Sequence, residues 1–281
     1  PMDYLNAIAN RFRATAPAAD YWSLRLVSEE TEHLAVRQGV TEPSALGSSL
    51  GAMVTLVQAG GIGYGATSDL SPAGLTAAWA RAARWAEWHA RLGLFSADLY
   101  PRSRLRADYA SPVAEPWEGL SLVDKLDLLH DACAALEIDP RIVDSSAWLG
   151  RRLVRQLLIT SDGGEVRHQS DQVSSGLMAV ANAGSQTQTR TGGGADWGGQ
   201  GGLERLAQVG FRADAHRVAA EALALLDAPE CPVGTRDLLL MPNQMVLQIH
   251  ESIGHPLELD RILGDERNYA GTSFVTPDLF G

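Results

Sequence analysis

The chain has 281 residues, of which 45% are hydrophobic and 20% charged, a composition typical of a folded protein with more than one core. Its formal net charge of -11 repels phosphate backbones and anionic lipid headgroups, so we expect no nucleic-acid partner. No apolar run approaches the roughly 20 residues of a membrane-spanning helix, so we expect no membrane partner. The two cysteines and the lack of a basic-apolar leader favour a reducing, cytoplasmic location.

Residues 1–105 predict a small α/β unit. Ser71 and Pro72 supply an N-cap and a first-turn proline for an amphipathic helix over 72–92. His89 falls on its apolar side, where a packed core histidine is expected rather than a ligand. Short segments rich in β-branched and aromatic residues precede the helix and predict a sheet, namely 21–27, 32–37, 52–58 and 62–67.

Residues 106–230 predict a second unit, an antiparallel sheet with helices. The stretch from Ser96 to Gly119 lacks a hydrophobic period and predicts a linker between the two units. Ser121 and Asp124 form a capping box for a helix that ends before Asp139. A meander of successive strands follows, which favours antiparallel pairing: 141–148, 152–160, 166–173, 177–182 and 186–191.

Glycines crowd the stretch from Gly192 to Gly202, around Trp197. This composition is typical of a mobile loop, which could serve as a lid facing a substrate. A flexible connector into a long helix over 203–226 is an equally good interpretation, because glycine enrichment alone identifies no ligand. Both interpretations stay open.

A third unit is predicted over 231–281, with a strand at 237–241 and a helix over 244–254. That helix carries His250, Glu251 and His255. Two neutral imidazoles are good zinc ligands, and a zinc ion with an open position lowers the pKa of water to about 7. A glutamate directly after the first histidine can take the proton from that water as a general base. The competing interpretation is a surface pair of Glu251 and His255, with His250 packed against the helix.

The spacing between the two histidines is one residue longer than in the familiar His-Glu-x-x-His motif. On a regular helix the extra residue turns His255 about 140° away from His250, too far to share one ion. The sequence offers two remedies. Gly254 and the following Pro256 could break the helix before His255. Alternatively, a one-residue π-bulge could realign the rings.

Two carboxylates follow the motif closely, Glu258 and Asp260. Either could accept a hydrogen bond from a ligand imidazole and fix its tautomer, as metal-binding histidines usually require. Alternatively, both are solvated carboxylates paired with Arg261 and Arg267. We therefore consider them as residues that could orient a ligand histidine, and not as metal ligands.

The run His-Glu-Ser-Ile-Gly-His-Pro-Leu-Glu-Leu-Asp-Arg, followed by Gly271-Thr272-Ser273, resembles the signature of the TldD/PmbA family. The run from Gly61 to Ser71 before an amphipathic helix is similar to that family's N-terminal module. The resemblance implies an α+β protein in three parts. These are the small α/β unit, the middle unit, and from residue 231 the start of a larger, β-rich catalytic unit.

The resemblance further implies a zinc-dependent peptidase that cleaves unfolded or flexible peptides in a cavity between two related subunits, in a homodimer or a heterodimer. His250 and His255 match the family's zinc ligands and Glu251 its catalytic base. The family's third ligand is a cysteine far downstream, and neither Cys133 nor Cys231 lies in that place. The sequence ends at residue 281, so we expect a catalytic unit that is cut short, with its third ligand unidentified.

Three other functions compete with this interpretation. Gly61-x-Gly63-x-x-Ala66 resembles a dinucleotide-binding fingerprint, but the helix opens only after Ser71, and no strand ending in an acidic residue follows. A non-catalytic partner subunit with an incomplete metal site is the stronger rival. An adventitious site for copper or nickel is the third, since imidazole pairs bind these ions tightly.

Overall fold

The computed structural model describes residues 2–93, 96–99, 102, 104–264 and 267–280. The chain divides into two compact units, Pro1–Ala228 and Pro229–Gly281. None of the helices in the described ranges combines the length and hydropathy needed to cross a bilayer.

The first unit is built on one mixed sheet in the order β4-β3-β1-β6-β7-β5. Its pairing is antiparallel except for β5, which runs parallel to β7. These strands are β1 (Tyr21–Arg37), β3 (Ala45–Gln58), β4 (Gly61–Thr67), β5 (Arg106–Ala110), β6 (Ile142–Thr160) and β7 (Glu165–Ala183). Short strands extend it: β2 (Val40–Thr41) pairs with β1, while β8 (Gln186–Gly193) and β9 (Gly199–Gln200) pair with β7. The α+β class expected from the sequence is confirmed.

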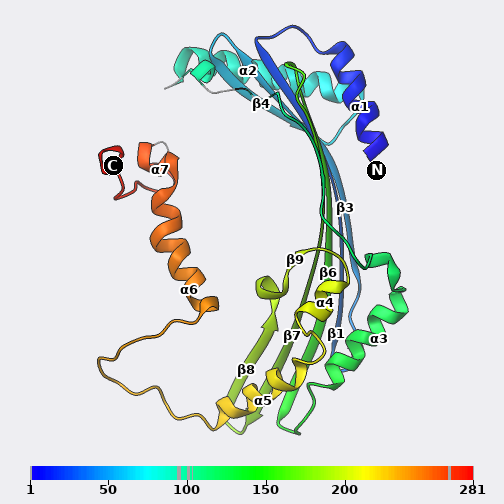
Figure 1. Cartoon of the computed structure of the whole chain (residues 1–281), viewed down its shortest axis with the longest axis vertical. Coiled ribbons are helices and arrows are strands. Elements are labelled where there is room, and N and C mark those ends of the chain that lie inside the picture. Colours follow the sequence, from blue (N-terminus) through cyan, green and yellow to red (C-terminus); the bar gives the residue numbers. More distant parts are fainter. Residues whose placement is uncertain (1, 94–95, 100–101, 103, 265–266, 281) are drawn as a thin grey trace. The chain divides into compact units, whose positions relative to one another are not determined.

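Strands β1, β6 and β7 run without interruption from the end covered by α1 and α2 to the end covered by α3 and α5 (Figure 1). The prediction of two short strands in place of each was therefore wrong. Hydrophobic alternation is lost in the middle of these strands, where polar side chains pair across the sheet instead. Arg152 of β6 bonds both carboxylate oxygens of Glu29 on β1, at 2.9 and 2.8 Å. Arg155 bonds Glu30 at 2.6 Å.

Two hydrophobic cores lie along this one sheet. The first contains Leu24 and Leu26 of β1, and the second contains Leu34 and Val36 of the same strand. All four are even-numbered, so they lie on one face of the strand. Helices α1 (Met2–Thr15) and α2 (Pro72–Leu92) contribute to the first core. Helices α3 (Leu122–Ala134), α4 (Glu204–Gln208) and α5 (Ala215–Leu226) contribute to the second.

Helix α1 was not anticipated from the sequence. Its buried residues Leu5, Ile8, Ala9 and Phe12 follow the spacing of one helical face, so the signal was present. Helix α2 matches its predicted bounds, and the Ser71 hydroxyl accepts from the Gly74 N–H at 3.2 Å as an N-cap.

Helix α2 packs directly on β4 because the strand has glycines at alternate positions. A Cβ added to Gly61, Gly63 or Gly65 would lie 2.0, 2.0 or 1.9 Å from a carbonyl oxygen of α2. Close packing of backbone on backbone therefore accounts for these glycines.

The predicted linker over 96–119 is wrong in part. It contains a short 3-10 turn at Ala97–Leu99, strand β5, and another 3-10 turn at Trp117–Gly119, while residues 100, 101 and 103 lie outside the described residues. Strand β5 gains its order from parallel pairing with residues 165–169 of β7. Such a distant partner leaves no periodic signal in the linker itself.

The capping box of α3 is confirmed. Ser121 Oγ accepts from the Asp124 N–H at 3.2 Å, and the Asp124 carboxylate accepts from the Ser121 N–H at 3.0 Å. The single helix predicted over 203–226 is wrong, because α4 and α5 are separated near Gly210, whose φ is 67°.

The glycine-rich stretch 192–202 has regular structure. It forms a 3-10 turn at Gly194–Trp197 and strand β9, whose residues pair with Gln172 and Val173 of β7. The ring of Trp197 meets Phe211 edge-on, with centroids 6.1 Å apart. This contact with the second core favours the connector interpretation over that of a lid.

The second unit consists of short helical segments. These are α6 (Pro242–Ile249), a π-helical turn (His250–Gly254), a 3-10 turn (His255–Leu257), α7 (Leu259–Leu263) and a 3-10 turn (Pro277–Leu279). The strand predicted at 237–241 is wrong, because these residues have no regular structure before α6. A strand needs a partner strand, and none of the described strands belongs to this unit. The predicted boundaries between units, at 105/106 and 230/231, stay predictions. The sheet contains strands from both sides of the first boundary.

Candidate metal centre

The motif histidines lie at the two ends of a π-helical turn that continues α6. The backbone N–H of His255 donates to the carbonyl oxygen of His250, five residues before it. In an α-helix this bond joins residues four apart, so the π turn accommodates one extra residue. Residues at i and i+5 then take the places that i and i+4 occupy on an α-helix. The structure therefore contains the π-bulge, the second of the two remedies expected for the long spacer.

The first remedy, a helix break before His255, is wrong. Gly254 has φ -58° and ψ -62°, and His255 has φ -61° and ψ -42°, so both are in the right-handed helical region. A following proline disfavours this region without forbidding it. Because the π turn already realigns the rings, the chain does not need to leave the helix at Gly254.

The turn brings together two imidazoles and a carboxylate. The ring centroids of His250 and His255 lie 4.3 Å apart with their planes at 81°. Nε2 of His250 and Nε2 of His255 lie 3.9 and 4.0 Å from oxygens of Glu251. Potential ligand atoms of all three residues lie within 4.8 Å of one another, the one such group of three or more in the described part of the chain.

These residues fit a zinc ion as donors. Neighbouring ligand atoms around tetrahedral zinc lie about 3.3 Å apart, given Zn–N bonds of about 2.0–2.1 Å. Modest side-chain rotation would bring the two imidazole nitrogens to that spacing, with the Glu251 carboxylate beside them. His250 keeps 59% of its side chain exposed, which argues against the alternative in which it packs against Val246 and Ile249. The Glu251–His255 contact at 4.0 Å is compatible with both interpretations.

Of the two predicted supporting carboxylates, Glu258 contacts a histidine. Its Oε1 lies 2.8 Å from Nδ1 of His255. This hydrogen bond, together with the ion pair to Arg261, lowers the pKa of Glu258 despite the opposing effect of desolvation. Asp260 instead accepts from the backbone N–H of Arg261 at 2.9 Å. The alternative pairing with arginine also occurs, because Arg261 forms an ion pair with Glu258.

The sequence interpretation missed the central place of Arg261 beyond that ion pair. Its Nη2 lies 3.3 Å from Nδ1 of His255, and its Nη1 donates to the carbonyl of Ala270 at 3.2 Å. Ser273 Oγ donates to the carbonyl of Pro256 at 2.6 Å, so the segment after α7 folds back on the motif. The spacing of Glu258 and Arg261, three residues apart, was the available signal.

Neither cysteine joins this group. Cys133 is fully buried in the second core of the first unit, with its sulfur 3.2 Å from Ser145 Oγ. Cys231 is exposed and lies outside the His250, Glu251 and His255 group. Within the described residues, the only potential ligand grouped with the two histidines is therefore Glu251.

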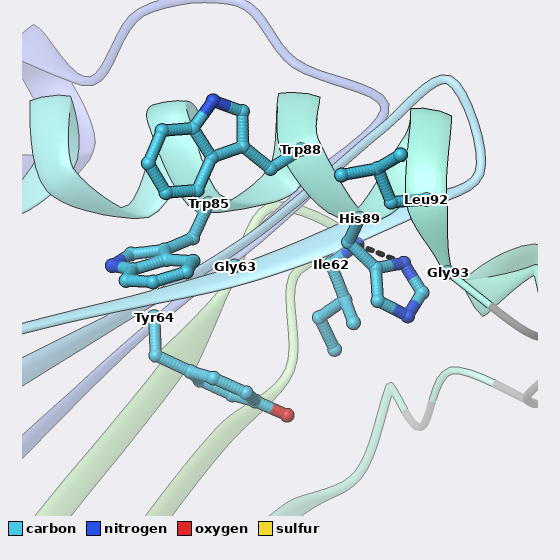
Figure 2. A pocket seen from close by; sticks show the side chains of 8 residues that line it. All are labelled: Ile62, Gly63, Tyr64, Trp85, Trp88, His89, Leu92 and Gly93. Atoms are coloured by element: carbon cyan, nitrogen blue, oxygen red, sulfur yellow. Dashed lines mark hydrogen bonds between the residues drawn. The ribbon is translucent and has the colours of Figure 1, made fainter.

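A separate groove lies in the first unit, between β4 and α2 (Figure 2). Trp85 and Trp88 of α2 meet edge-on there, with ring centroids 4.9 Å apart, and Tyr64 lies on the strand side. The Ile62 N–H donates to Nδ1 of His89 at 3.3 Å. His89 is half-buried and binds the sheet backbone, in line with the structural role expected from the sequence. The described lining contains no carboxylate and no second imidazole.

Comparison with known proteins matches two family models to the first unit. Residues 22–87 match the PmbA/TldA metallopeptidase domain 1, and residues 115–226 match the PmbA/TldA metallopeptidase central domain. Together the two models cover more than half of the chain. Neither matched range includes the histidine motif.

A protein named metalloprotease from Methanothermobacter thermautotrophicus is 29% identical over 150 residues, which are 53% of this chain and 32% of that protein. Among solved structures, a protein from Thermotoga maritima described as a modulator of DNA gyrase has a TM-score of 0.60 at 15% identity. TldE from Thermococcus kodakarensis has a TM-score of 0.51 at 14% identity. These structures share the fold of the chain.

The aligned parts cover 82% and 80% of this chain but only 50% and 47% of those two structures. The chain thus spans about half the length of these structures, and the match spans about a third of the curated relative. Two consecutive family domains, in the order and fold of these relatives, establish the ancestry of the first unit. The chain belongs to the PmbA/TldD family.

Proposed function

We propose that this chain carries part of the active site of a zinc-dependent peptidase. The observation that carries the proposal is the π turn, which brings the ligand atoms of His250, Glu251 and His255 within 4.8 Å of one another. Membership of a family described as metallopeptidases and a relative named metalloprotease support it. In this proposal His250 and His255 hold the metal, while Glu258 supports His255.

A bound zinc ion supplies Lewis-acid chemistry, which makes water nucleophilic at neutral pH. Glu251 is the proposed general base. A carboxylate oxygen of Glu251 takes a proton from the attacking water and then delivers it to the nitrogen of the leaving amine. The side chain of Glu251 is 71% exposed, so substrate and solvent reach it without a change of fold.

Unfolded or flexible peptides are the proposed substrates. The motif lies on exposed short helices, and an extended main chain can reach such a site more readily than a folded domain can. We propose a dimer with a second copy or a related subunit, in the cytoplasm. A peptide could lie between the two subunits of such a dimer.

A second candidate is a non-catalytic partner subunit with an incomplete metal site. One observation favours it: with Glu251 reserved as the general base, the ligand group in the described residues offers the metal two histidines and no cysteine. Catalytic zinc sites usually have three protein ligands. The two candidates differ in whether zinc binds and in what Glu251 contributes.

The test is zinc content and peptide hydrolysis of the full chain, alone and with any co-purifying subunit, against His250→Ala and Glu251→Gln. The peptidase proposal predicts near-stoichiometric zinc that is lost in His250→Ala. It also predicts that Glu251→Gln keeps the metal and loses hydrolysis of a fluorogenic peptide. Absence of zinc from the parent chain, together with unchanged partner binding in Glu251→Gln, would instead establish the scaffold role.

A further inference from the structure

We propose that Arg261 is a positioning residue for the metal site, holding Glu258 so that His255 presents Nε2 to the metal. The inference rests on the proposed function, because it concerns the same histidine. It assigns a role to a residue that lies six positions after His255 and outside the His-Glu-x-x-x-His motif.

The first step is the tautomer of His255. A carboxylate only accepts hydrogen bonds, and Glu258 Oε1 lies 2.8 Å from Nδ1 of His255. Nδ1 therefore carries a hydrogen, and in the neutral imidazole Nε2 then carries the lone pair. This is the tautomer in which Nε2 is available to a metal.

The second step is what holds the carboxylate in place. The side chain of Glu258 is 41% exposed, so alone it would exchange rotamers with solvent. Its second oxygen, Oε2, forms an ion pair with Nε of Arg261, whose N–H is not aligned as a hydrogen bond. Its other oxygen, Oε1, accepts from Nδ1 of His255. The carboxylate is thus bridged, and its orientation depends on both partners.

Arg261 also contacts Nδ1 of His255, the atom that donates to Glu258. Its Nη2 lies 3.3 Å from Nδ1 of His255 and could donate to that nitrogen only in the opposite tautomer. The bond from Nδ1 to Glu258 is shorter and charge-assisted, so the metal-competent tautomer is favoured while Arg261 holds Glu258. Without the arginine, the Glu258 carboxylate would no longer be held in one orientation. His255 would then lose its preference for the tautomer with the hydrogen on Nδ1.

Arg261 is itself fixed from the other side. Its Nη1 donates to the carbonyl of Ala270 at 3.2 Å, and its own carbonyl accepts from the Ser273 N–H at 3.3 Å. The guanidinium therefore presents separate nitrogens to Glu258 and to Ala270. A lysine ammonium cannot serve both directions in this fixed geometry.

The chain offers a matched control. Arg267 is also an arginine of the second unit, and its side chain is exposed. In the described structure no hydrogen bond or ion pair joins it to Glu258 or His255. Arg267→Gln makes the same charge change as Arg261→Gln without touching this arrangement.

The experiment compares the full chain with Arg261→Gln, Arg261→Lys and Arg267→Gln. Cobalt titration, followed by visible absorption, gives metal affinity. Long-range ¹H–¹⁵N correlation spectra of the metal-free chain give the tautomer of His255. We expect both Arg261 variants to lose about 10- to 100-fold in affinity. We also expect part of their His255 population to shift toward the Nε2–H form, while Arg267→Gln matches the parent chain.

Affinity within twofold of the parent and an unchanged tautomer in Arg261→Gln would overturn the positioning role. If that variant loses helical circular dichroism, Arg261→Lys decides by the same two measurements. A parent chain that binds no cobalt or zinc would refute the proposed function instead. The tautomer comparison would then still decide the role of Arg261.

Discussion

His250 and His255 are joined by a backbone hydrogen bond as well as by their place in the motif, since the N–H of His255 donates to the His250 carbonyl. The same bond that closes the π turn therefore sets the distance between the two imidazoles. A change in the number of residues within the turn should alter the metal site directly, even if every ligand is retained. π-Helical turns are rare and occur often at functional sites.

Deletion of Ile253 should convert the turn to α-helix and restore the His-Glu-x-x-His spacing. We expect such a chain to keep cobalt affinity within about tenfold, because residues four apart share one face of an α-helix. Insertion of one alanine after Ile253 should reduce affinity by more than about 100-fold, since neither turn aligns residues six apart. An equal loss of cobalt affinity in both variants would show that the turn does not act by setting the spacing of the two histidines.

Gly254→Ala should preserve the metal site and strengthen the turn. An added Cβ would have its nearest neighbour, the Ile249 carbonyl oxygen, at 3.7 Å, and the backbone is already helical. Alanine is favoured over glycine in a helix by about 0.5–1 kcal/mol, so amide exchange around residues 250–255 should slow about two- to fivefold. Gly271→Ala is the control, because its φ of 81° disfavours alanine. Faster exchange in Gly254→Ala would contradict the helical geometry of the turn.

Gly63→Ala should destabilise the first unit by about 1–3 kcal/mol, through overpacking of α2 against β4. The new Cβ would lie 2.0 Å from the Ala82 carbonyl oxygen, which is backbone and cannot rotate away. Urea unfolding measures the loss. Gly119→Ala, where nothing lies within 4 Å of the new Cβ, should be near neutral. Comparable losses in both variants would count against close helix–strand packing as the cause.

Glu32→Gln should destabilise the fold more than Lys125→Met does. Lys125 is 4% exposed, pairs with Glu32 at 3.6 Å and lies 4.0 Å from the centre of the Trp117 ring. Removing Glu32 leaves a buried ammonium without its partner, at a cost of about 3 kcal/mol, whereas methionine removes the charge. Urea unfolding at neutral pH ranks the two variants.

The same pair predicts a pH dependence. Burial lowers the pKa of Lys125 below its ordinary value of 10.5, and Glu32 opposes that shift. In Glu32→Gln the pKa should fall further, so between this lowered pKa and 10.5 the unfolded state binds more protons than the folded state. Its stability relative to the parent chain should therefore recover as the pH rises from 7 toward 10. A constant difference over that range would contradict the buried ammonium.

Glu204 should contribute to stability above its unfolded pKa and lose that contribution in acid. Desolvation raises its pKa, but backbone N–H groups of Gly202 and Glu115 outweigh this effect and lower the pKa to about 2. A depressed folded pKa stabilises the protein at neutral pH, and the effect fades as the pH falls from about 4.5 to 2. Glu204→Gln should therefore lose about 1 kcal/mol at pH 7 and little near pH 2, by urea unfolding. A loss of stability in Glu204→Gln that is equal at pH 7 and near pH 2 would contradict this effect.

The parts of the fold that local chemistry determines could be predicted from the sequence. Ser71 and Ser121 mark the starts of α2 and α3, because each hydroxyl accepts a backbone N–H of its own helix. The continuity of β1 could not be predicted, since Glu29 and Glu30 interrupt its alternation. Their arginine partners on β6 are more than 120 residues away in sequence. The pairing of β5 with β7 depends in the same way on a distant strand.

The candidate site was accessible to sequence reasoning for a similar reason. His250, Glu251 and His255 are close in sequence, so helical geometry alone limits where they lie. The choice between a helix break and a π turn required the backbone, because both satisfy the spacing. The contribution of Arg261 also required side-chain geometry, since a three-residue separation from Glu258 is equally typical of an ordinary surface ion pair.

Strand β1 contributes Leu24 to one hydrophobic core and Leu34 to the other. The two matched domains therefore share this strand and cannot be separated without disrupting a core. Residues 23–37 of β1 pair along their whole length with residues 146–160 of β6. In a fragment restricted to the first matched domain, this edge of β1 would lose its partner strand. The unpaired edge could then aggregate with other strands. The two domains should consequently unfold in a single cooperative transition. Recombination between relatives would have to exchange both domains together.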